Sequence, residues 1–374
     1  MKRIVILGGS YAGVSTAHRI LKQVPKATGV KVTLVSPNTH FYWSMASPRG
    51  VVPGQIPDEK LFQPIADGFV GYPPGQFEHI VASAESLDVH AKTVGLSGST
   101  GLRTLDYDFL ILATGSRTHG GIPFKVLGST EATKDALHDF QARVKKAKTI
   151  VIAGAGVTGV EVAGELGFEY GKQKEIILIA SGPSILEEAP ASVSKIATKA
   201  LQDLNVKLQL QTKVTSSSGP TAQSPTGRQE LTLSRGQKIV ADMYVPTFGL
   251  VPNSSYIPAQ FLDAKGFVLV DEMLRVKGTE DVWAVGDVSA IEPAQFITCD
   301  KQSAHLAKNM TLILSNKTPL PYKVATSRFM GLQIGKKAAT GHFGTYKVPG
   351  FIIAWARKTL FVENLAPTVN GSLF

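Results

Sequence analysis

The chain has 374 residues, more than one domain usually contains, so we expect two or three domains, each large enough to bury its own core. The single cysteine, Cys299, excludes a disulfide framework, a redox dithiol and any metal site built from several cysteines. The net charge of +10 favours anionic neighbours, but the cations are dispersed without interleaved aromatic residues, which argues against nucleic acid.

The first predicted element is an apolar strand that starts at Ile4 and runs into a glycine-rich turn, with the sequence IVILGGSYAG. Such a turn brings backbone N–H groups and the positive end of the next helix to a pyrophosphate. Gly8 would form the tight turn, and Gly13 would let the helix pack closely against the strand. Ser10 replaces the middle glycine of the G-x-G-x-x-G pattern. We therefore predict a nucleotide site whose middle position carries a hydroxymethyl group.

The second strand is predicted over Lys31–Val35, after a helix over Val14–Gln23. A Rossmann unit usually carries an acid that binds ribose at the end of this strand, and here Ser36 and Asn38 stand at that point. Either side chain would make a weaker ribose contact than an acid. Further on, Arg49 lies in an aromatic stretch, where it either pairs with the pyrophosphate or lies on the surface.

Two more strands and a hinge are predicted before the middle of the chain. Residues around His79–Val81 form a short strand whose backbone can meet an adenine, and Asp108–Gly115 ends in a small-residue turn that lets a cofactor approach closely. Arg117–Gly128 is glycine-rich and predicts a hinge, followed by an amphipathic helix over Asp135–Lys146. Lys125 lies in this hinge and faces either a cleft between domains or solvent.

The opening pattern then repeats. An apolar strand over Thr149–Gly154 leads into a turn with the complete G-x-G-x-x-G pattern and a helix over Val157–Tyr170, 146 residues after the first turn. Two such units in one chain indicate an internal duplication rather than an ordinary strand-to-helix connection. Glu161 lies in the first turns of this helix, where the dipole stabilises an acid and where the side chain can face a second cofactor. The glycines of the second turn are Gly154, Gly156 and Gly159.

The strand after this helix, Glu175–Ala180, ends in Ser181 and Gly182. An acid at this point favours NAD and an arginine favours NADP, so the residues leave the nicotinamide preference open. The chain continues through a polar surface hairpin at Ser216–Arg228 and a strand at Lys238–Pro246.

Another strand with a functional ending is predicted over Thr279–Asp287, where the last two residues are Gly286 and Asp287. The glycine permits close approach of a cofactor, and the carboxylate can accept hydrogen bonds from sugar-alcohol hydroxyls. A helix over Ala294–Leu314 follows, and we interpret Cys299 near its start as a small core residue.

The C-terminal stretch predicts strands over Thr326–Gly335 and Ala339–Phe343 and a short basic amphipathic helix over Gly350–Lys358. This helix either packs against its own sheet, which we favour, or rests on a membrane surface. No apolar run approaches the roughly 18 residues of a transmembrane helix, and the first strand starts too early for a signal or transit peptide. We therefore expect a cytoplasmic protein and leave open attachment to a membrane such as the outer mitochondrial membrane.

With both glycine turns, the ATG turn at Ala113–Gly115 and the VWAVGD strand in this order, the sequence resembles the two-dinucleotide-binding-domain flavoproteins. Within them it is most similar to the apoptosis-inducing-factor-like branch that includes ferroptosis suppressor protein and its fungal relatives, and more distantly to type II NADH dehydrogenases. The resemblance runs from Ile4 to about Val362 and implies an α/β fold with two Rossmann-like domains and a small α+β C-terminal domain. The implied domains are an FAD domain of residues 1–120 and 243–310, an inserted NAD(P)H domain of residues 121–242 and a C-terminal interface domain of residues 311–374.

The resemblance also implies which residues bind the cofactors FAD and NAD(P)H. The first turn would hold the FAD pyrophosphate, the backbone near Val81 would meet the adenine, and Asp287 would bind the ribityl chain. Lys125 and Glu161 would be the catalytic residues, with Glu161 near the nicotinamide and the flavin. The implied FAD contacts are Gly8, Gly9, Ser10, Tyr11, Ala12, Gly13, Ser36, Arg49, Val81, Ala113, Thr114, Gly115, Gly286 and Asp287, and the implied NAD(P)H contacts are Gly154, Gly156 and Gly159.

The reaction that the resemblance implies is hydride transfer from NAD(P)H to FAD, followed by reduction of a quinone-like acceptor. A tailoring oxidoreductase that acts on a specific aromatic metabolite would use the same scaffold, and a redox-sensing flavoprotein that binds lipid or nucleic acid is a third alternative. The eight histidines show no metal-ligand spacing, so no metal is expected. The sequence leaves the identity of the acceptor and the oligomeric state open.

Overall fold

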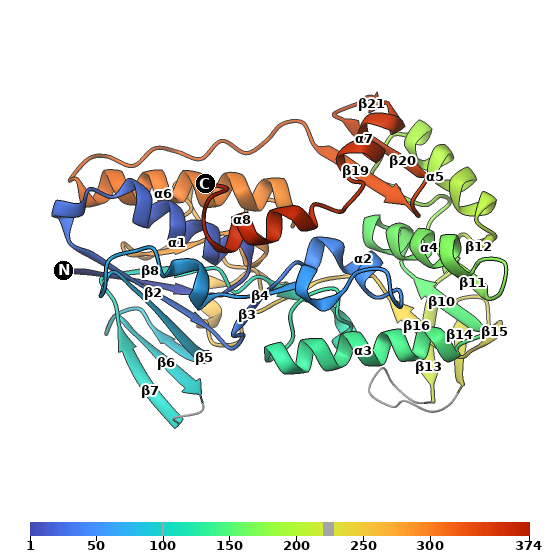
Figure 1. Cartoon of the computed structure of the whole chain (residues 1–374), viewed down its shortest axis with the longest axis horizontal. Helices are drawn as coiled ribbons and strands as arrows, with labels where there is room; N and C mark the ends of the chain where they lie inside the picture. The colour runs from blue at the N-terminus through green and yellow to red at the C-terminus, as the bar shows by residue number, and fades with distance from the viewer. Residues whose placement is uncertain (99–100, 220–227) are drawn as a thin grey trace.

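The computed structural model describes residues 1–98, 101–219 and 228–374. Figure 1 shows two sheet-centred units side by side, with the C-terminal segment lying across both. Most of the predicted hairpin at Ser216–Arg228 lies outside the described residues.

The first unit is built on a seven-stranded sheet with the order β18-β8-β1-β2-β5-β6-β7. The strands from β18 to β5 run parallel, and β5, β6 and β7 form an antiparallel extension. Helices α1 (Tyr11–Gln23) and α6 (Phe296–Leu314) pack together on one face of the sheet (Figure 1). The strands are β1 (Lys2–Leu7), β2 (Val30–Ser36), β5 (Phe77–Asp88), β6 (Thr93–Gly98), β7 (Gly101–Asp106), β8 (Phe109–Leu112) and β18 (Val282–Ala284).

Strand β1 is the middle one of the five parallel strands, because residues 4–7 are apolar on both faces. Ile4 and Ile6 pack into one core cluster, while Val5 and Leu7 pack into a second cluster on the opposite face. A parallel strand covered on both faces needs such a continuous apolar run rather than an alternating one.

Short elements extend the first unit toward the second. Strand β3 pairs with β4, and β9 pairs with β17 across the predicted hinge. The bounds are β3 (His40–Tyr42), α2 (Ser47–Gly50), β4 (Phe62–Pro64), β9 (Ser116–Arg117) and β17 (Val251–Pro252).

The second unit repeats the parallel arrangement with a four-stranded sheet in the order β12-β11-β10-β16. A small antiparallel sheet, β13-β14-β15, packs beside it. The elements are α3 (Thr130–Lys146), β10 (Thr149–Ala153), α4 (Val157–Tyr170), β11 (Glu175–Ile179), α5 (Ala191–Asp203), β12 (Val206–Gln209), β13 (Val214–Ser218), β14 (Gln229–Leu233), β15 (Lys238–Ala241) and β16 (Met243–Pro246).

The run predicted as one strand, Lys238–Pro246, is divided between two sheets. Its first half pairs antiparallel with β14, and its second half pairs parallel with β10. Asp242 stands at the division, and its side chain accepts hydrogen bonds from the backbone N–H groups of Lys148 and Thr149. Residues 243–246 therefore belong to the sheet of the second unit, so the predicted domain boundary between residues 242 and 243 comes too early.

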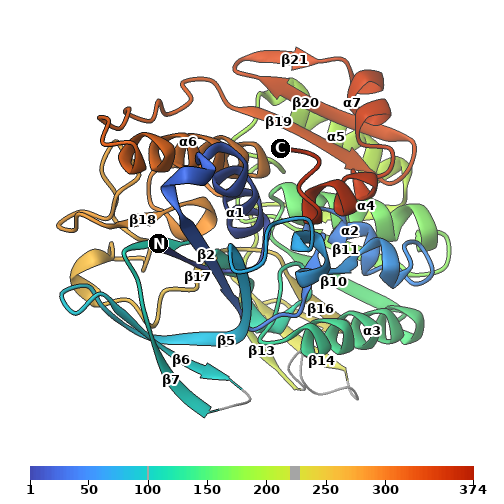
Figure 2. The same cartoon turned by 60° about the vertical axis from the view of Figure 1, so that its left-hand side comes forward.

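The C-terminal segment packs against both units. The connection after α6 runs the length of the molecule to a three-stranded antiparallel sheet beside α4 and α5, whereas α8 returns to pack on α1 (Figures 1 and 2). The elements are β19 (Phe329–Ile334), β20 (Ala338–Phe343), β21 (Tyr346–Val348), α7 (Gly350–Ala356) and α8 (Leu365–Val369). No helix in the described parts of the chain has the length and apolar character needed to cross a membrane.

Candidate active site

The first glycine turn joins β1 to α1 and lies against the ATG turn that follows β8. Gly8 has a φ of +120°, and a Cβ added there would lie 2.1 Å from the carbonyl oxygen of Ala113. A Cβ added to Gly13 would lie 1.8 Å from the carbonyl oxygen of Gly8. Both positions therefore require glycine, because the backbone of the turn touches the helix and the neighbouring strand end.

The second glycine turn has the same construction. Gly154 has a φ of +111°, and a Cβ added to Gly159 would lie 1.8 Å from the carbonyl oxygen of Gly154. The Thr247 hydroxyl donates hydrogen bonds to the carbonyl oxygens of Ala153 and Gly154, at 3.0 and 2.8 Å. A Cβ added to Gly156 would meet no heavy atom within 4 Å, so open space adjoins the middle of this turn.

Both turns leave the first backbone N–H groups of their helices free of side-chain caps. Neither Ser10, which precedes α1, nor Gly156, which precedes α4, makes a side-chain cap hydrogen bond. By contrast, Ser129 caps α3 by accepting a hydrogen bond from the N–H of Ala132 at 3.0 Å. Uncapped helix starts beside close-packed glycines suit a phosphate group, so these residues fit a dinucleotide at each turn.

The predicted ribose and adenine contacts of the first unit stand side by side. Ser36 and Val81 are register partners at the carboxyl ends of β2 and β5. Ser36 is 2% exposed, and its hydroxyl accepts a hydrogen bond from the backbone N–H of Asn38 at 3.1 Å. Val81 is 44% exposed. The arrangement leaves Val81 open to a ligand, and a ribose contact by Ser36 stays a prediction.

Lys125 and Asp287, which are 162 residues apart, meet in the structure. The Lys125 ammonium donates to Oδ2 of Asp287 at 2.7 Å, and the Ser116 hydroxyl donates to the same oxygen at 2.9 Å. Burial opposes ionisation of Asp287, but the Lys125 charge and these two hydrogen bonds hold its pKa below the usual range. The carboxylate is thus kept charged and oriented, with Oδ1 left to accept from a ligand. Ser116 was not predicted, although it directly follows the ATG turn.

The ATG turn is held in place by the loop that contains Asn253. The Thr114 hydroxyl donates to the carbonyl oxygen of Asn253 at 2.7 Å, and the Asn253 amide donates back to the carbonyl oxygen of Thr114 at 2.9 Å. The backbone N–H of Asn253 also donates to the carbonyl oxygen of Gly115 at 3.0 Å. This exchange fixes the turn that lies against Gly8.

Helix α4 carries two buried carboxylates, each paired with an arginine from another part of the chain. Glu161 accepts a hydrogen bond from Arg357 at 2.7 Å, and Glu165 accepts from two nitrogens of Arg49 at 2.7 and 3.0 Å. Burial raises the pKa of Glu161, although the Arg357 charge and the backbone N–H of Gln333 counteract this. The pKa of Glu161 is therefore shifted in the direction opposite to that of Asp287.

Arg49, in α2 of the first unit, contacts both the second unit and the C-terminal segment. Besides its ion pair with Glu165, it donates to the carbonyl oxygen of Lys358 at 2.8 Å. Its predicted position beside FAD stays a prediction. Sequence reasoning missed Glu165 and Arg357, and the available signal was the four-residue spacing of Glu161, Glu165 and Glu169 along one helix.

Tyr11, at the start of α1, and Cys299, in the first turn of α6, both lie near the N-terminal end of α6. The Tyr11 hydroxyl donates to Asp300 at 2.7 Å, and Asp300 also pairs with Arg19. Burial and Asp300 raise the pKa of Tyr11. Cys299 is buried, and burial raises the pKa of its thiol, which agrees with the interpretation as a core residue.

The structure holds no group of three or more His, Cys, Asp or Glu suited to a metal within its described residues.

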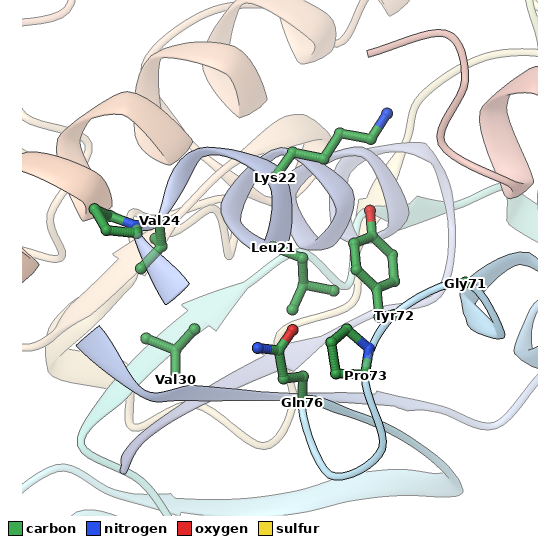
Figure 3. A pocket seen from close by; sticks show the side chains of 9 residues that line it. Leu21, Lys22, Val24, Val30, Gly71, Tyr72, Pro73 and Gln76 are labelled. Atoms are coloured by element: carbon green, nitrogen blue, oxygen red, sulfur yellow. The ribbon is translucent and has the colours of Figure 1, made fainter. Parts of the chain in front are cut away.

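A cavity of about 250 Å³ lies at the opposite end of α1 from the glycine turn (Figure 3). Leu21, Val30 and Tyr72 line it together with the ammonium-bearing side chain of Lys22. That ammonium already donates to the carbonyl oxygens of Gly371 and Phe374. The cavity is therefore separate from the residues grouped around the two turns.

Comparison with known proteins supports this arrangement. The model of the pyridine nucleotide-disulphide oxidoreductase family matches residues 2–311. The chain is 56% identical to oxidoreductase ptaL of Pestalotiopsis fici, with 100% of both chains covered, and 28% identical to ferroptosis suppressor protein 1 of Xenopus laevis, with 96% and 94% covered. The structure of the sulfide:quinone oxidoreductase from Aquifex aeolicus superposes with a TM-score of 0.80 at 19% identity, covering 99% of this chain and 92% of that one.

These matches confirm the predicted α/β fold with two dinucleotide-binding units and the resemblance to the apoptosis-inducing-factor-like proteins. The family is named for a disulphide, yet this chain has only Cys299 and thus no internal dithiol. With a family match over most of its length, the chain belongs to the pyridine nucleotide-disulphide oxidoreductases and is an oxidoreductase.

Proposed function

We propose that the protein is an FAD-dependent oxidoreductase that uses NAD(P)H and acts on a specific aromatic metabolite. The observation that carries the proposal is the pair of matching glycine turns, each with an uncapped helix start, together with the partly buried ion pair of Glu161 and Arg357. The turns fit two dinucleotides, and the ion pair suits an acceptor with polar substituents.

The residues of the first unit would hold the FAD. The turn from Gly8 to Gly13 would bind the pyrophosphate, the exposed backbone near Val81 would meet the adenine, and Asp287 would accept hydrogen bonds from hydroxyl groups of the cofactor. Lys125 keeps Asp287 ionised, so this acceptor does not lose its function near neutral pH. The flavin, when bound, supplies the redox chemistry by taking a hydride from the reduced nicotinamide and passing two electrons to the acceptor.

The acceptor side is formed by α4 and the segment after α7. Glu161 and Arg357 form their ion pair inside the protein, and the Nε of Arg357 is buried without a hydrogen-bond partner among the described residues. The Oε1 of Gln333 is likewise buried and unpaired in the described part of the chain. Unused buried donors and acceptors favour a ligand with matching phenol, carbonyl or carboxylate groups. The raised pKa of Glu161 suits a carboxyl that delivers a proton to such a ligand.

The names of the relatives specify no acceptor, so they support oxidoreductase activity without favouring one acceptor class. The chain shares 56% identity over its full length with the fungal oxidoreductase ptaL, but 28% with the Xenopus laevis ferroptosis suppressor protein 1. The superposition on the sulfide:quinone oxidoreductase, at 19% identity, supports the fold alone. The experiment must therefore distinguish a specific aromatic metabolite from a quinone as the acceptor.

The test is steady-state oxidation of NADH and NADPH by the purified yellow protein, with a short-chain ubiquinone analogue or a panel of hydroxylated aromatic ketones. We expect turnover with members of the panel and none with the quinone. In the variant Arg357→Gln, the KM for the aromatic substrate should rise about tenfold or more, because a charged hydrogen-bond donor is lost, while reduction of the flavin by the nucleotide stays unchanged. Strong turnover with the simple quinone would instead support a quinone reductase, and absence of flavin would reject both.

We also propose that the outer face of α7 contacts an anionic lipid surface. Ile353 packs this helix against its own sheet, as favoured from the sequence, but Phe351 and Trp355 on the same helix are 76% and 81% exposed. Exposed aromatic residues beside Lys347 and Lys358 suit the interface of an anionic membrane. The double variant Phe351→Ser and Trp355→Ser should no longer co-sediment with phosphatidylserine vesicles, whereas equal sedimentation of both proteins would contradict the proposal.

A further inference from the structure

The loop after β11 folds back onto the second glycine turn. The backbone N–H of Leu186 donates to the carbonyl oxygen of Ala155 at 2.9 Å, which ties the end of the loop to the turn between β10 and α4. At the beginning of the loop, the N–H of Gln211 donates to the carbonyl oxygen of Gly182 at 2.8 Å. Residues 182–186 are therefore held at both ends, beside the carboxyl edge of the parallel sheet.

This loop places the carboxylate of Glu187 directly over Gly182. A Cβ added to Gly182 would lie 1.5 Å from Oε1 of Glu187 and 2.6 Å from its Oε2. Gly182 leaves the space into which the carboxylate fits, and any other residue would displace it. Glu187, eight residues beyond the end of β11 at Ile179, thus lies over Gly182, which is only three residues beyond that end.

The Glu187 carboxylate has no hydrogen bond or ion pair to any residue in the described parts of the chain. Its neighbour Glu188 differs, because it pairs with Arg328 at 3.0 Å. Residues 181–189 contain no lysine or arginine. Glu187 is thus unpaired among the described residues, and its negative charge would repel a second anion brought beside it.

In a Rossmann unit, an acid at the end of the second strand accepts hydrogen bonds from the ribose hydroxyls of NAD, and it repels the 2′-phosphate of NADP. Ser181 and Gly182 occupy that point in this chain, which left the preference open from the sequence. We infer that Glu187 takes the place of this acid, so that the second unit binds NADH in preference to NADPH. The inference rests on the proposed binding of NAD(P)H at the second turn and makes that proposal specific.

The test is a binding titration of the flavin-containing protein with NAD⁺ and with NADP⁺, in which isothermal titration calorimetry measures the dissociation constants. The wild-type protein should bind NAD⁺ more tightly than NADP⁺. In Glu187→Gln, the Kd for NAD⁺ should rise about tenfold or more, since a charged acceptor of two hydroxyl hydrogen bonds is lost, and the Kd for NADP⁺ should stay the same or fall. Glu187→Arg should reverse the preference, because a guanidinium attracts the 2′-phosphate.

Glu188→Gln is the matched control. It removes the same charge one residue away, from a side chain whose partner is Arg328, and should leave both dissociation constants unchanged. Equal loss of affinity for both nucleotides in Glu187→Gln, or tighter binding of NADP⁺ by the wild-type protein, would overturn the inference. If the wild-type protein bound neither nucleotide, the proposed function itself would fail and the inference would fail with it.

Discussion

The two glycine turns of this chain share their outer positions and differ in the middle. Gly13 and Gly159 each pack so closely on the first glycine of their turn that an added Cβ would lie 1.8 Å from its carbonyl oxygen. The middle position is Ser10 in the first turn and Gly156, beside open space, in the second. The comparison teaches that the chain's own packing dictates the outer glycines and places no such demand on the middle position of the second turn.

The helices that follow the turns differ as well. At the same distance from the turn, α1 carries Ser15 and Arg19 where α4 carries Glu161 and Glu165. Arg19 pairs with Asp300 inside the first unit, while both glutamates of α4 pair with arginines from other parts of the chain. The first helix is thus held within its own unit, and the second helix ties the units together.

The largest effect is expected from breaking the shared outer positions. Gly13→Ala and Gly159→Ala should each cost more than about 4 kcal/mol, because neither the helix nor the backbone carbonyl can move aside. Gly13→Ala should lose the flavin, measured as flavin per chain, and Gly159→Ala should lose nucleotide binding. Both should melt at a lower temperature in scanning fluorimetry.

Gly156→Ala is the control for this pair, since its added Cβ meets open space. This substitution should leave the melting temperature unchanged and weaken only the binding of the nucleotide. A large drop in its melting temperature would contradict the division between packing glycines and ligand glycines.

A smaller effect is expected from the ion pair that only α4 possesses. Glu165→Ala leaves Arg49 buried without its carboxylate and should cost about 3 kcal/mol. The matched change on α1 is Arg19→Ala, which removes the partner of Asp300. It should cost less stability, because the Asp300 side chain is already 37% exposed to solvent. Chemical unfolding followed by fluorescence gives both values, and equal losses would show that α4 is no more constrained than α1.

The two units should also respond to pH in opposite directions. The pKa of Asp287 is lowered in the fold, so its contribution to stability is present above about pH 4 and is lost as the pH falls through the folded value. The pKa of Glu161 is raised, so its protonated form stabilises the fold at low pH and this contribution is lost as the pH rises through the folded value. Melting temperatures from pH 3 to 7 should show a weaker acid-side loss in Asp287→Asn and a weaker loss on raising the pH in Glu161→Gln. Parallel curves for both variants would contradict these assignments.

The smallest effect should come from making the first turn like the second. Ser10 makes no side-chain cap bond, so Ser10→Gly should change stability by only about 0.5 kcal/mol or less. Retention of flavin during dialysis measures the contribution of the hydroxyl. A loss of flavin in this variant would assign Ser10 a direct contact with the cofactor.

The sequence was sufficient for the features that rest on continuous apolar runs and fixed glycines. Helix α4 occupies the predicted range Val157–Tyr170. Lys125 and Asp287 form an ion pair, and their roles at a cofactor stay a prediction. Strand β7 was missed because its side chains are almost all exposed and show no apolar period. The division of Lys238–Pro246 was missed because it depends on Asp242 bonding to the backbone of a strand 93 residues away.

The acid at the nucleotide-binding edge of the second unit could not be predicted for a related reason. Glu187 reaches Gly182 only because the loop is bonded to Ala155, and no local pattern in the sequence reports such a return. Sequence spacing identifies acids that follow a strand directly. It does not identify acids that a loop brings back to the strand end.

The split of the first unit along the chain has a consequence for synthesis. Its sheet needs β18, at residues 282–284, and the cover of α1 needs α8, whereas the parallel sheet of the second unit is complete at residue 246. At translation rates of about 5–20 residues per second, roughly ten to thirty seconds separate the emergence of β8 from that of its partner β18. The middle of the protein is thus ready to fold on the ribosome first, while β8 waits with one edge unpaired.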